Sequence, residues 1–106
     1  MESCIQISTT TDSIESARKL ASILLKEKKA ACIQIIPNVE SHYKWKNKLE
    51  VTSEFLLLIK TFSNQEEYVV EIIRSIHPYS TPEIISNGID ILDKPYGEWL
   101  KSSMES

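Results

Sequence analysis

A long β-hairpin is the feature of this sequence that most constrains its fold. The stretches "ACIQII" at 31–36 and "VESHYKW" at 39–45 are typical of a strand, and we expect a bend or bulge between them at Pro37-Asn38, because proline cannot donate to a sheet ladder. The stretch "LEVTSEFLLLIKTF" at 49–62 predicts a long returning strand. Asn47 lies in the connection and tolerates the left-handed conformation that a tight turn needs. The sequence therefore predicts an extended hairpin.

Two helices and two shorter strands are predicted around this hairpin. A strand at 3–8 precedes a helix that stops near Ala30, and the apolar residues of that helix recur at helical spacing: Ile14, Ala17, Ala21, Leu24 and Leu25. The second helix begins at "SNQE", where Ser63 and Glu66 have the spacing of a capping box, and Pro78 ends it after one apolar stripe: Val69, Ile72, Ile73 and Ile76. A strand at 83–90 and a short helix from Pro95 follow, and we expect the aromatic face of that helix to dock on the body: Tyr96, Trp99 and Leu100.

The order of these elements, β-α-β-β-α-β-α, predicts the α+β class. With the hairpin between the second and third strands, it is the ferredoxin-like split β-α-β sandwich, an antiparallel sheet with helices on one face. Right-handed crossovers place both long helices on the same side. The 106 residues suit one domain of ordinary size, and no linker or low-complexity segment divides them. We therefore expect a single domain over 1–106.

The third strand indicates that this chain alone leaves one face of its sheet uncovered. The run "FLLLI" at 55–59 is apolar at successive positions, so apolar side chains point to both faces. The helices cover one face, and no residues remain to build a layer over Leu56 and Leu58. An exposed apolar face is an aggregation hazard. Another subunit is the economical cover, and we infer an oligomer.

Composition and charge exclude several classes of protein. Twelve basic and 15 acidic residues give a net charge of -3, which argues against nucleic acid as a partner even though Lys44, Lys46 and Lys48 alternate along the hairpin. Two cysteines are too few for a disulfide framework and favour a reducing, cytoplasmic location. The N-terminus lacks the pattern of a signal peptide, and no apolar run approaches about 18 residues. We expect no membrane partner.

Five ordered motifs carry a family resemblance. They are "AACIQIIP", the tyrosine and tryptophan of "YKWKNKLE", "LLLIKT", "SIHPYSTPEII" and "PYGEWL". With these motifs over about 30–100, the chain resembles the CutA family of divalent-cation tolerance proteins. It departs from the family pattern at Asn47, where many members have glycine, and at Ser80, where glutamate is common. The second departure removes an oxygen that could bind a metal.

The resemblance implies a fold similar to that of PII signalling proteins and a tight homotrimer. It also implies association with copper or other divalent metal ions, and no established catalytic reaction. No nucleophile-base pair or phosphate-binding loop in the sequence supports catalysis, so we expect that this protein is not an enzyme. The expected function is that of a trimeric divalent-cation tolerance protein involved in the response to metal ions. The alternatives are a PII-like sensor of a small anionic ligand and a structural trimer that acts as a scaffold for partner proteins.

Cys32, His77 and Glu83 are the candidate metal ligands. Thiolate and imidazole suit copper or zinc, and a carboxylate adds an oxygen donor. The sequence has no compact ligand pair such as C-x-x-C, so the metal, Cu²⁺ or another divalent ion, is not expected to be obligate for folding. A structural interpretation stays open for two of them, since Cys32 suits a buried apolar position and His77 suits the end of a helix. We expect His42 to be solvated.

A second candidate site is a ligand cleft between subunits. Tyr43 and Trp45 on the hairpin, Lys60 on the third strand and Tyr79 near Glu83 could line it. Aromatic rings with one cation suit a small anionic ligand. The competing interpretation is subunit packing, because tyrosine and tryptophan are enriched at protein interfaces.

Overall fold

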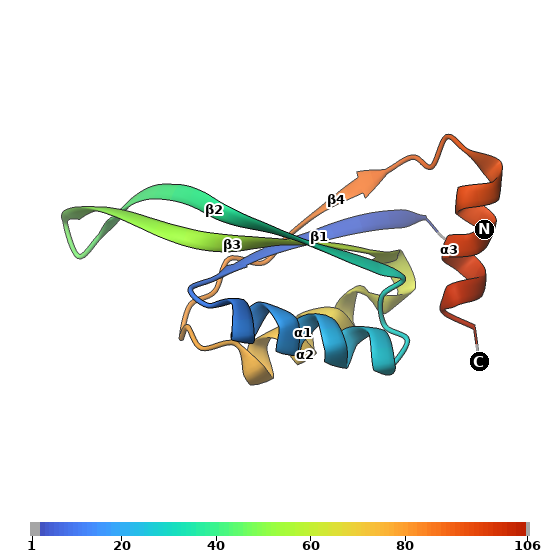
Figure 1. Cartoon of the computed structure of the whole chain (residues 1–106), viewed down its shortest axis with the longest axis horizontal. Helices are drawn as coiled ribbons and strands as arrows, with labels where there is room; N and C mark the ends of the chain where they lie inside the picture. Colours follow the sequence, from blue (N-terminus) through green and yellow to red (C-terminus); the bar gives the residue numbers. More distant parts are fainter. Residues whose placement is uncertain (1–2, 106) are drawn as a thin grey trace.

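The computed structural model describes residues 3–105, which form a four-stranded sheet and three α-helices in the predicted order (Figure 1). The fold is the α+β, ferredoxin-like one. The elements are β1 Cys4–Thr11, α1 Ile14–Lys26, β2 Cys32–Trp45, β3 Lys48–Phe62, a 3-10 turn η1 Ser63–Gln65, α2 Glu66–Ile76, β4 Ile85–Ile89 and α3 Lys94–Ser103. That all of 1–106 form one domain stays a prediction.

The sheet has the strand order β2-β3-β1-β4, and all its neighbours pair antiparallel. β3 is central and long: its Lys60 lies opposite Cys32 of β2 and Gln6 of β1, and its Leu56 lies opposite Ile36 and Thr10. β4 and β2 are the edge strands. Beyond the end of β1, β2 and β3 continue as a free hairpin, which makes the molecule elongated, with extents of 46 × 25 × 21 Å.

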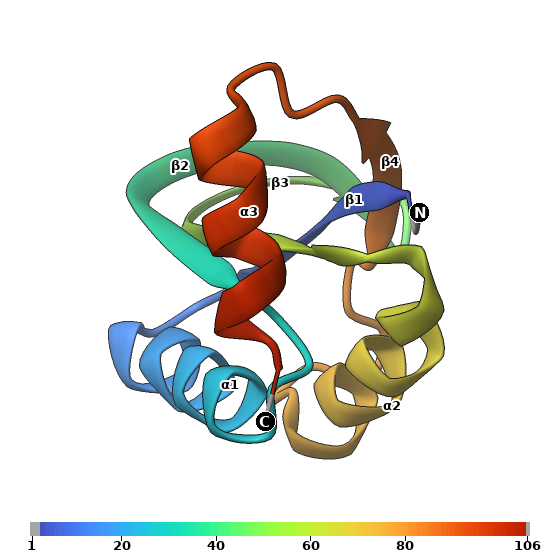
Figure 2. The same ribbon diagram turned by 90° about the vertical axis from the view of Figure 1, so that its right-hand side faces the viewer.

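α1 and α2 lie side by side on one face of the sheet, as the crossover rule predicts (Figures 1 and 2). Between the helices and the sheet, alternate residues of β1 and β3 form a closed core with one side of each helix; the fully buried members include Ile7, Leu20, Leu24, Leu57, Ile59, Val69 and Ile73. On the other face of the sheet, Leu56 and Leu58 remain partly exposed. α3 covers only one end of the sheet, beside the start of β2 (Figure 2).

The hairpin contains both backbone irregularities that the sequence predicts. The register between β2 and β3 shifts between Ile36 and Val39, and Asn38 within that bulge has a φ of 61°. The tight turn has positive φ at both Lys46 (50°) and Asn47 (65°), the pattern of a type I′ turn. Asparagine tolerates this left-handed conformation better than most residues do.

Three local predictions differ from the structure. α1 ends at Lys26 and buries Leu20 rather than Leu25, because its stripe is Ala17, Leu20 and Leu24. The stretch from Ser63 forms a 3-10 turn, so α2 begins at Glu66 with Gln65 at its N-cap. The Glu66 carboxylate accepts a hydrogen bond from the Ser86 hydroxyl of β4 at 2.9 Å. The predicted capping box therefore does not mark the start of the α-helix.

The aromatic face of α3 also differs from its prediction. Leu100 is fully buried, whereas Tyr96 and Trp99 keep 37% and 48% of their surface exposed within one chain. The helix begins as expected for its sequence: Asp93 caps it by accepting a hydrogen bond from the Tyr96 N–H at 3.0 Å, and Pro95 lies in the first turn. Leu100 is therefore the fully buried side chain of α3, while the aromatic pair is only partly covered within one chain.

Candidate functional site

His77 lies where α2 gives way to the segment before β4, and it is only 9% exposed. Its extended backbone ends α2 ahead of Pro78. The ring Nδ1 accepts a hydrogen bond from the Tyr79 N–H at 3.0 Å, so Nε2 carries the ring proton and donates to the Thr10 carbonyl oxygen at 2.8 Å. This is the neutral ring, with both nitrogens bound to backbone. A metal ion could reach either nitrogen only by displacing one of these bonds.

Tyr79 connects this turn to a carboxylate, that of Glu54, which sequence reasoning missed. Its hydroxyl donates to Oε2 of Glu54 at 2.6 Å, and its ring lies 4.8 Å from that of His77. Glu54, on β3, is only 6% exposed. Burial, followed by the hydrogen bond and charge of Glu54 and then by Asp12 and Tyr43, raises the pKa of Tyr79 well above its ordinary value. The available signal was an acid, Glu54, directly before the apolar run of the third strand.

Cys32 lies at the other end of the sheet, as the first residue of β2. Lys60 is opposite it on β3, and the Lys60 Nζ donates to Oε1 of Gln34 at 2.6 Å. The hydroxyl of Tyr96 on α3 lies beside the Cys32 thiol; burial first, and then Cys32, raise the pKa of Tyr96. Cys32 is a free, partly exposed thiol. It is therefore more accessible than the buried apolar position that the alternative interpretation suggested.

The three candidate metal ligands are not assembled within one chain. His77 binds the carbonyl of Thr10, whose partner on β3 is Leu56, whereas the partner of Cys32 is Lys60. Four residues of strand separate these ends by roughly 13 Å. Glu83 is exposed, two residues before β4, near the His77 end. Over residues 3–105, no three His, Cys, Asp or Glu side chains are grouped closely enough to hold a metal ion.

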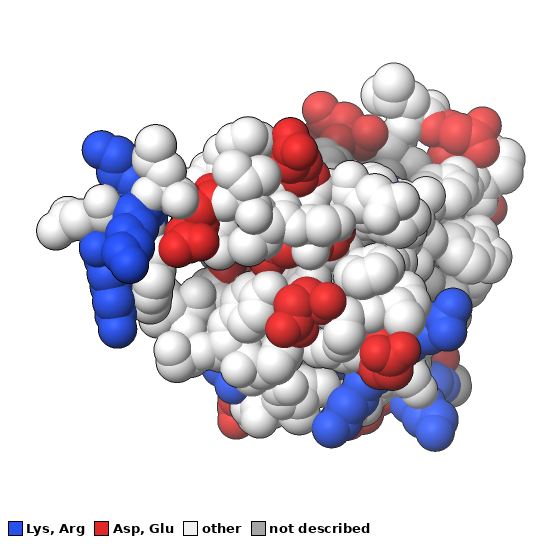
Figure 3. All heavy atoms as spheres, turned by 60° about the vertical axis from the view of Figure 1, so that its left-hand side comes forward, with Lys and Arg blue, Asp and Glu red and all other residues white. Residues whose placement is uncertain are grey.

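The predicted ligand cleft is likewise divided. Tyr43 lies close enough to Tyr79 for its charge to affect the pKa of that residue. Lys60 is at the far end of the sheet beside Cys32, and Trp45 is at the hairpin tip with 52% of its surface exposed. Basic side chains gather at the projecting tip, where Lys44, Lys46 and Lys48 are exposed (Figure 3). Within one chain, Tyr79 therefore has the carboxylates of Glu54 and Asp12 as its charged neighbours.

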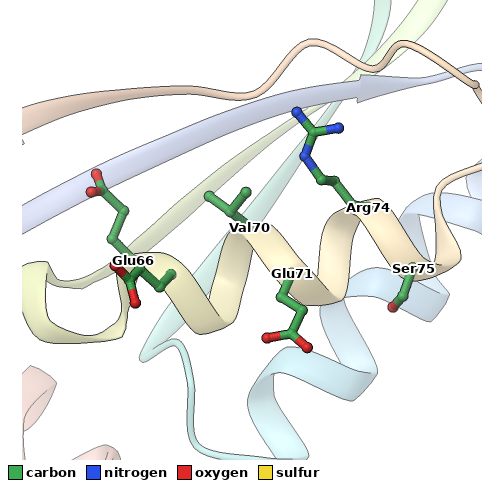
Figure 4. Close-up of a pocket in the computed structure, with 6 residues that line it drawn as sticks. Glu66, Val70, Glu71, Arg74 and Ser75 are labelled. Atoms are coloured by element: carbon green, nitrogen blue, oxygen red, sulfur yellow. The ribbon is translucent and has the colours of Figure 1, made fainter.

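α2 carries a shallow hollow of about 610 Å³ along its length. Its lining comes from one helix: Glu66, Glu67, Val70, Glu71, Arg74 and Ser75. Figure 4 shows Arg74 pointing to the opposite side of the helix from Glu71. None of the candidate metal-binding or ligand-cleft residues lines this hollow. Within residues 3–105, no helix is long and apolar enough to cross a membrane.

Comparison with known proteins identifies relatives along nearly the whole chain. The family model described as "CutA1 divalent ion tolerance protein" matches residues 5–103. Protein CutA homolog of Xenopus laevis is 43% identical over 84 residues, which cover 79% of this chain and 56% of that protein. The divalent-cation tolerance protein CutA of Thermus thermophilus is 35% identical over 94 residues, 89% of this chain and 91% of that one. The chain spans about half the length of the first curated relatives it matches.

Solved structures agree in fold. The divalent ion tolerance protein CutA1 of Ehrlichia chaffeensis superimposes with a TM-score of 0.93 at 28% identity, covering 100% of this chain and 99% of that one. The periplasmic divalent cation tolerance protein CutA of Archaeoglobus fulgidus gives a TM-score of 0.91 at 32% identity, covering 96% and 99%. The matched span, the similar sequences and the superpositions lead to the same assignment: this chain belongs to the CutA1 divalent ion tolerance protein family.

Proposed function

We propose that this chain acts in divalent-cation tolerance as a homotrimer that binds Cu²⁺ or another divalent metal ion and takes part in the response to metal ions. The observation that carries the proposal is the partly exposed Cys32 thiol, a soft donor, at one end of the uncovered face of the sheet. The core closes from this chain's own side chains, so the metal is not required for folding. We propose a binding role rather than a catalytic one, in the cytoplasm.

The metal donors would come from different copies of the chain. Cys32 lies at one end of the sheet, and Glu83 and His77 lie toward the other, so one chain cannot join them. An assembly that covers Leu56 and Leu58 can place the Cys32 end of one copy against the Glu83 end of the next. His77 would join such a site only by breaking one of its two ring hydrogen bonds, to the Tyr79 N–H or to the Thr10 carbonyl oxygen. Binding should weaken as pH falls, because protons compete for thiolate and imidazole donors.

Equilibrium titration of the assembled protein with Cu²⁺ and Zn²⁺ tests this proposal. Cys32→Ser should reduce metal affinity by at least about tenfold, because it replaces a soft thiolate with a weak hydroxyl donor. Cys4→Ser is the matched control, since Cys4 is also free and partly exposed. Equal affinity in the wild type and both variants would remove Cys32 from the site. Absence of stoichiometric binding by the wild type would contradict the metal-binding role itself.

A sensor of a small anionic ligand is the second candidate. The proximity of Tyr43 and Tyr79 favours it, because these two rings could form one wall of a cleft completed by Lys60 and Trp45 of another copy. Titration with small phosphate and carboxylate anions tests it. Binding that disappears in Lys60→Gln, with assembly retained, would support the cleft. Loss of affinity only for metal in Cys32→Ser would favour the first proposal.

A further inference from the structure

The uncovered face of β3 carries an ordered set of side chains. Residues 54, 56, 58 and 60 alternate with the core positions Leu57 and Ile59, so they share the face away from the helices. They form the series glutamate, leucine, leucine, lysine. Six residues of strand separate the two charges by roughly 20 Å, which rules out an ion pair within one chain. The series has opposite charges at its ends and apolar side chains between them.

Glu54 is a buried carboxylate without a positive partner in its own chain. Only 6% of the residue is exposed, and its identified hydrogen bond is from the uncharged Tyr79 hydroxyl. The other titratable groups that act on Tyr79 are Asp12 and Tyr43, and neither supplies positive charge. Within the described part of the chain, no Lys, Arg or His nitrogen lies within 4.0 Å of the Glu54 carboxylate. A buried charge is normally paired or bound to a metal, so this one calls for a cation.

Lys60 is the complementary group. Its ammonium donates to the neutral Gln34 amide, and no carboxylate oxygen of residues 3–105 lies within 4.0 Å of it. It is partly exposed on the same face as Glu54, beyond Leu58. Glu54 and Lys60 therefore each lack an oppositely charged partner within the described residues, and they lie at the two ends of the partly exposed surface formed by Leu56 and Leu58.

We propose that Lys60 of a second copy of this chain supplies the cation for Glu54, completing a buried Lys60–Glu54–Tyr79 site at the contact between copies. Placed head to tail, the lysine end of one such face can meet the glutamate end of the next, with the leucines facing the contact. In a closed ring each copy gives its Lys60 to one neighbour and receives one from the other. This inference rests on the proposed assembly and names the contact that would build it. It also moves Cys32, opposite Lys60, toward the neighbour's loop that holds His77 and Glu83.

A double-mutant cycle on assembly tests the pair. Glu54→Gln and Lys60→Gln should each weaken the association of copies by roughly thirtyfold or more, because each leaves one buried charge without its partner. The double variant should lose little beyond either single variant. Two side chains held roughly 20 Å apart in one chain have no direct contact, so strong coupling between them must arise between copies. Dissociation constants come from sedimentation velocity over a dilution series.

The controls separate this contact from general charge effects and from misfolding. Glu40→Gln and Lys44→Gln change exposed charges on the hairpin and should alter association by less than about threefold. The Glu54→Gln variant retains a side-chain oxygen that can accept a hydrogen bond from the Tyr79 hydroxyl. Lys60→Glu provides a second variant at a partly exposed position, and it should weaken association more than Lys60→Gln by opposing Glu54 with like charge.

Three results would overturn the inference. Additive effects of the two glutamine variants, with assembly present, would show that Glu54 and Lys60 do not meet, and would leave the proposed function intact. Loss of Cu²⁺ affinity in Glu54→Gln with unchanged association would assign the carboxylate to a metal ion instead. A wild-type protein that is monomeric at micromolar concentration would remove the proposed assembly together with this contact.

Discussion

The two faces of β3 differ in how much of their environment this chain supplies. Leu57 and Ile59 on the helix face are fully buried against α1, α2 and β1. Leu56 and Leu58, their neighbours in sequence, remain partly exposed, and the charged residues beside them lack opposite charges in the same chain. One strand therefore contributes to a completed core on one side and to an incomplete surface on the other. Substitutions on the first side should affect folding, and those on the second should affect association.

Leu57→Ala should produce the largest loss of stability. The side chain is fully buried among the core residues of both helices, so its truncation leaves a cavity that the packed neighbours cannot fill. We expect the free energy of unfolding to fall by about 2–5 kcal/mol. Urea unfolding at one fixed protein concentration measures it. A loss below about 1 kcal/mol would show that the helix face is less tightly packed than the structure indicates.

Leu56→Lys should affect association rather than folding, the reverse of the effect of Leu57→Ala. Lysine at a partly exposed position leaves the isolated chain folded, but it places an unpaired charge in the proposed contact between copies. We expect association to weaken by at least about a hundredfold, with the circular dichroism spectrum of the folded chain retained. Light scattering across a dilution series measures the assembly. Association equal to that of the wild type would show that this face is not the contact.

The sequence predicted the elements of the fold because each carries its own local signal. The hairpin follows from its two strand-forming stretches on either side of Asn47, the bulge from Pro37-Asn38 and the end of α2 from Pro78. Errors arose where a local pattern competed with packing. Leu25 has the helical spacing of a core residue, yet α1 turns Leu20 inward instead. Ser63 and Glu66 have the spacing of a cap, yet Glu66 reaches Ser86 on a strand distant in sequence.

The candidate site was less accessible to sequence reasoning, because its contacts are long-range. Nothing near His77 in sequence indicates that its ring binds the carbonyl of Thr10, 67 positions away. Glu54 gains its interest only from its burial and from Tyr79, which the fold brings beside it. The roles of Cys32, His77 and Glu83 as metal ligands stay predictions. They depend on how copies of the chain meet, which one chain does not contain.

His77→Ala tests the two hydrogen bonds that the ring makes where the chain passes from α2 toward β4, an edge strand of the sheet. The ring bridges Thr10 and Tyr79, and its removal leaves a buried carbonyl and an N–H without these partners. We expect stability to fall by about 2 kcal/mol. His42→Ala is the matched control, since that ring is exposed and, among residues 3–105, pairs with Glu40, and it should cost less than about 0.5 kcal/mol.

Metal titration of the same two variants separates structure from binding. If His77 is only a structural residue, His77→Ala loses stability but keeps Cu²⁺ affinity wherever assembly persists. Equal stability of the two histidine variants would contradict the role that the hydrogen bonds assign to His77. A loss of metal affinity specific to His77→Ala would instead show that the ring exchanges a backbone bond for a metal ion.

Tyr79→Phe should have the smallest effect, and its signature is the pH dependence. The raised pKa of Tyr79 means that the folded chain holds the phenolic proton more tightly than the unfolded chain does. The contribution of Tyr79 to the free energy of unfolding is therefore complete at pH values below the pKa of tyrosine in the unfolded chain, near 10. It declines as pH rises above that value, because the unfolded chain loses its phenolic proton first. At neutral pH, removal of the hydroxyl should cost about 1.5 kcal/mol, because Glu54 loses its hydrogen bond. Urea unfolding from pH 8 to 11 should show a shallower alkaline decline in the free energy of unfolding in Tyr79→Phe than in the wild type.

Tyr96→Phe is the control at the other end of the sheet, where the pKa of Tyr96 is also raised but the neighbour is Cys32 rather than a carboxylate. An alkaline decline unchanged in Tyr79→Phe and abolished in Tyr96→Phe would place the sensitive group at the Cys32 end, and would reverse the assignment of the buried charge to Glu54 and Tyr79.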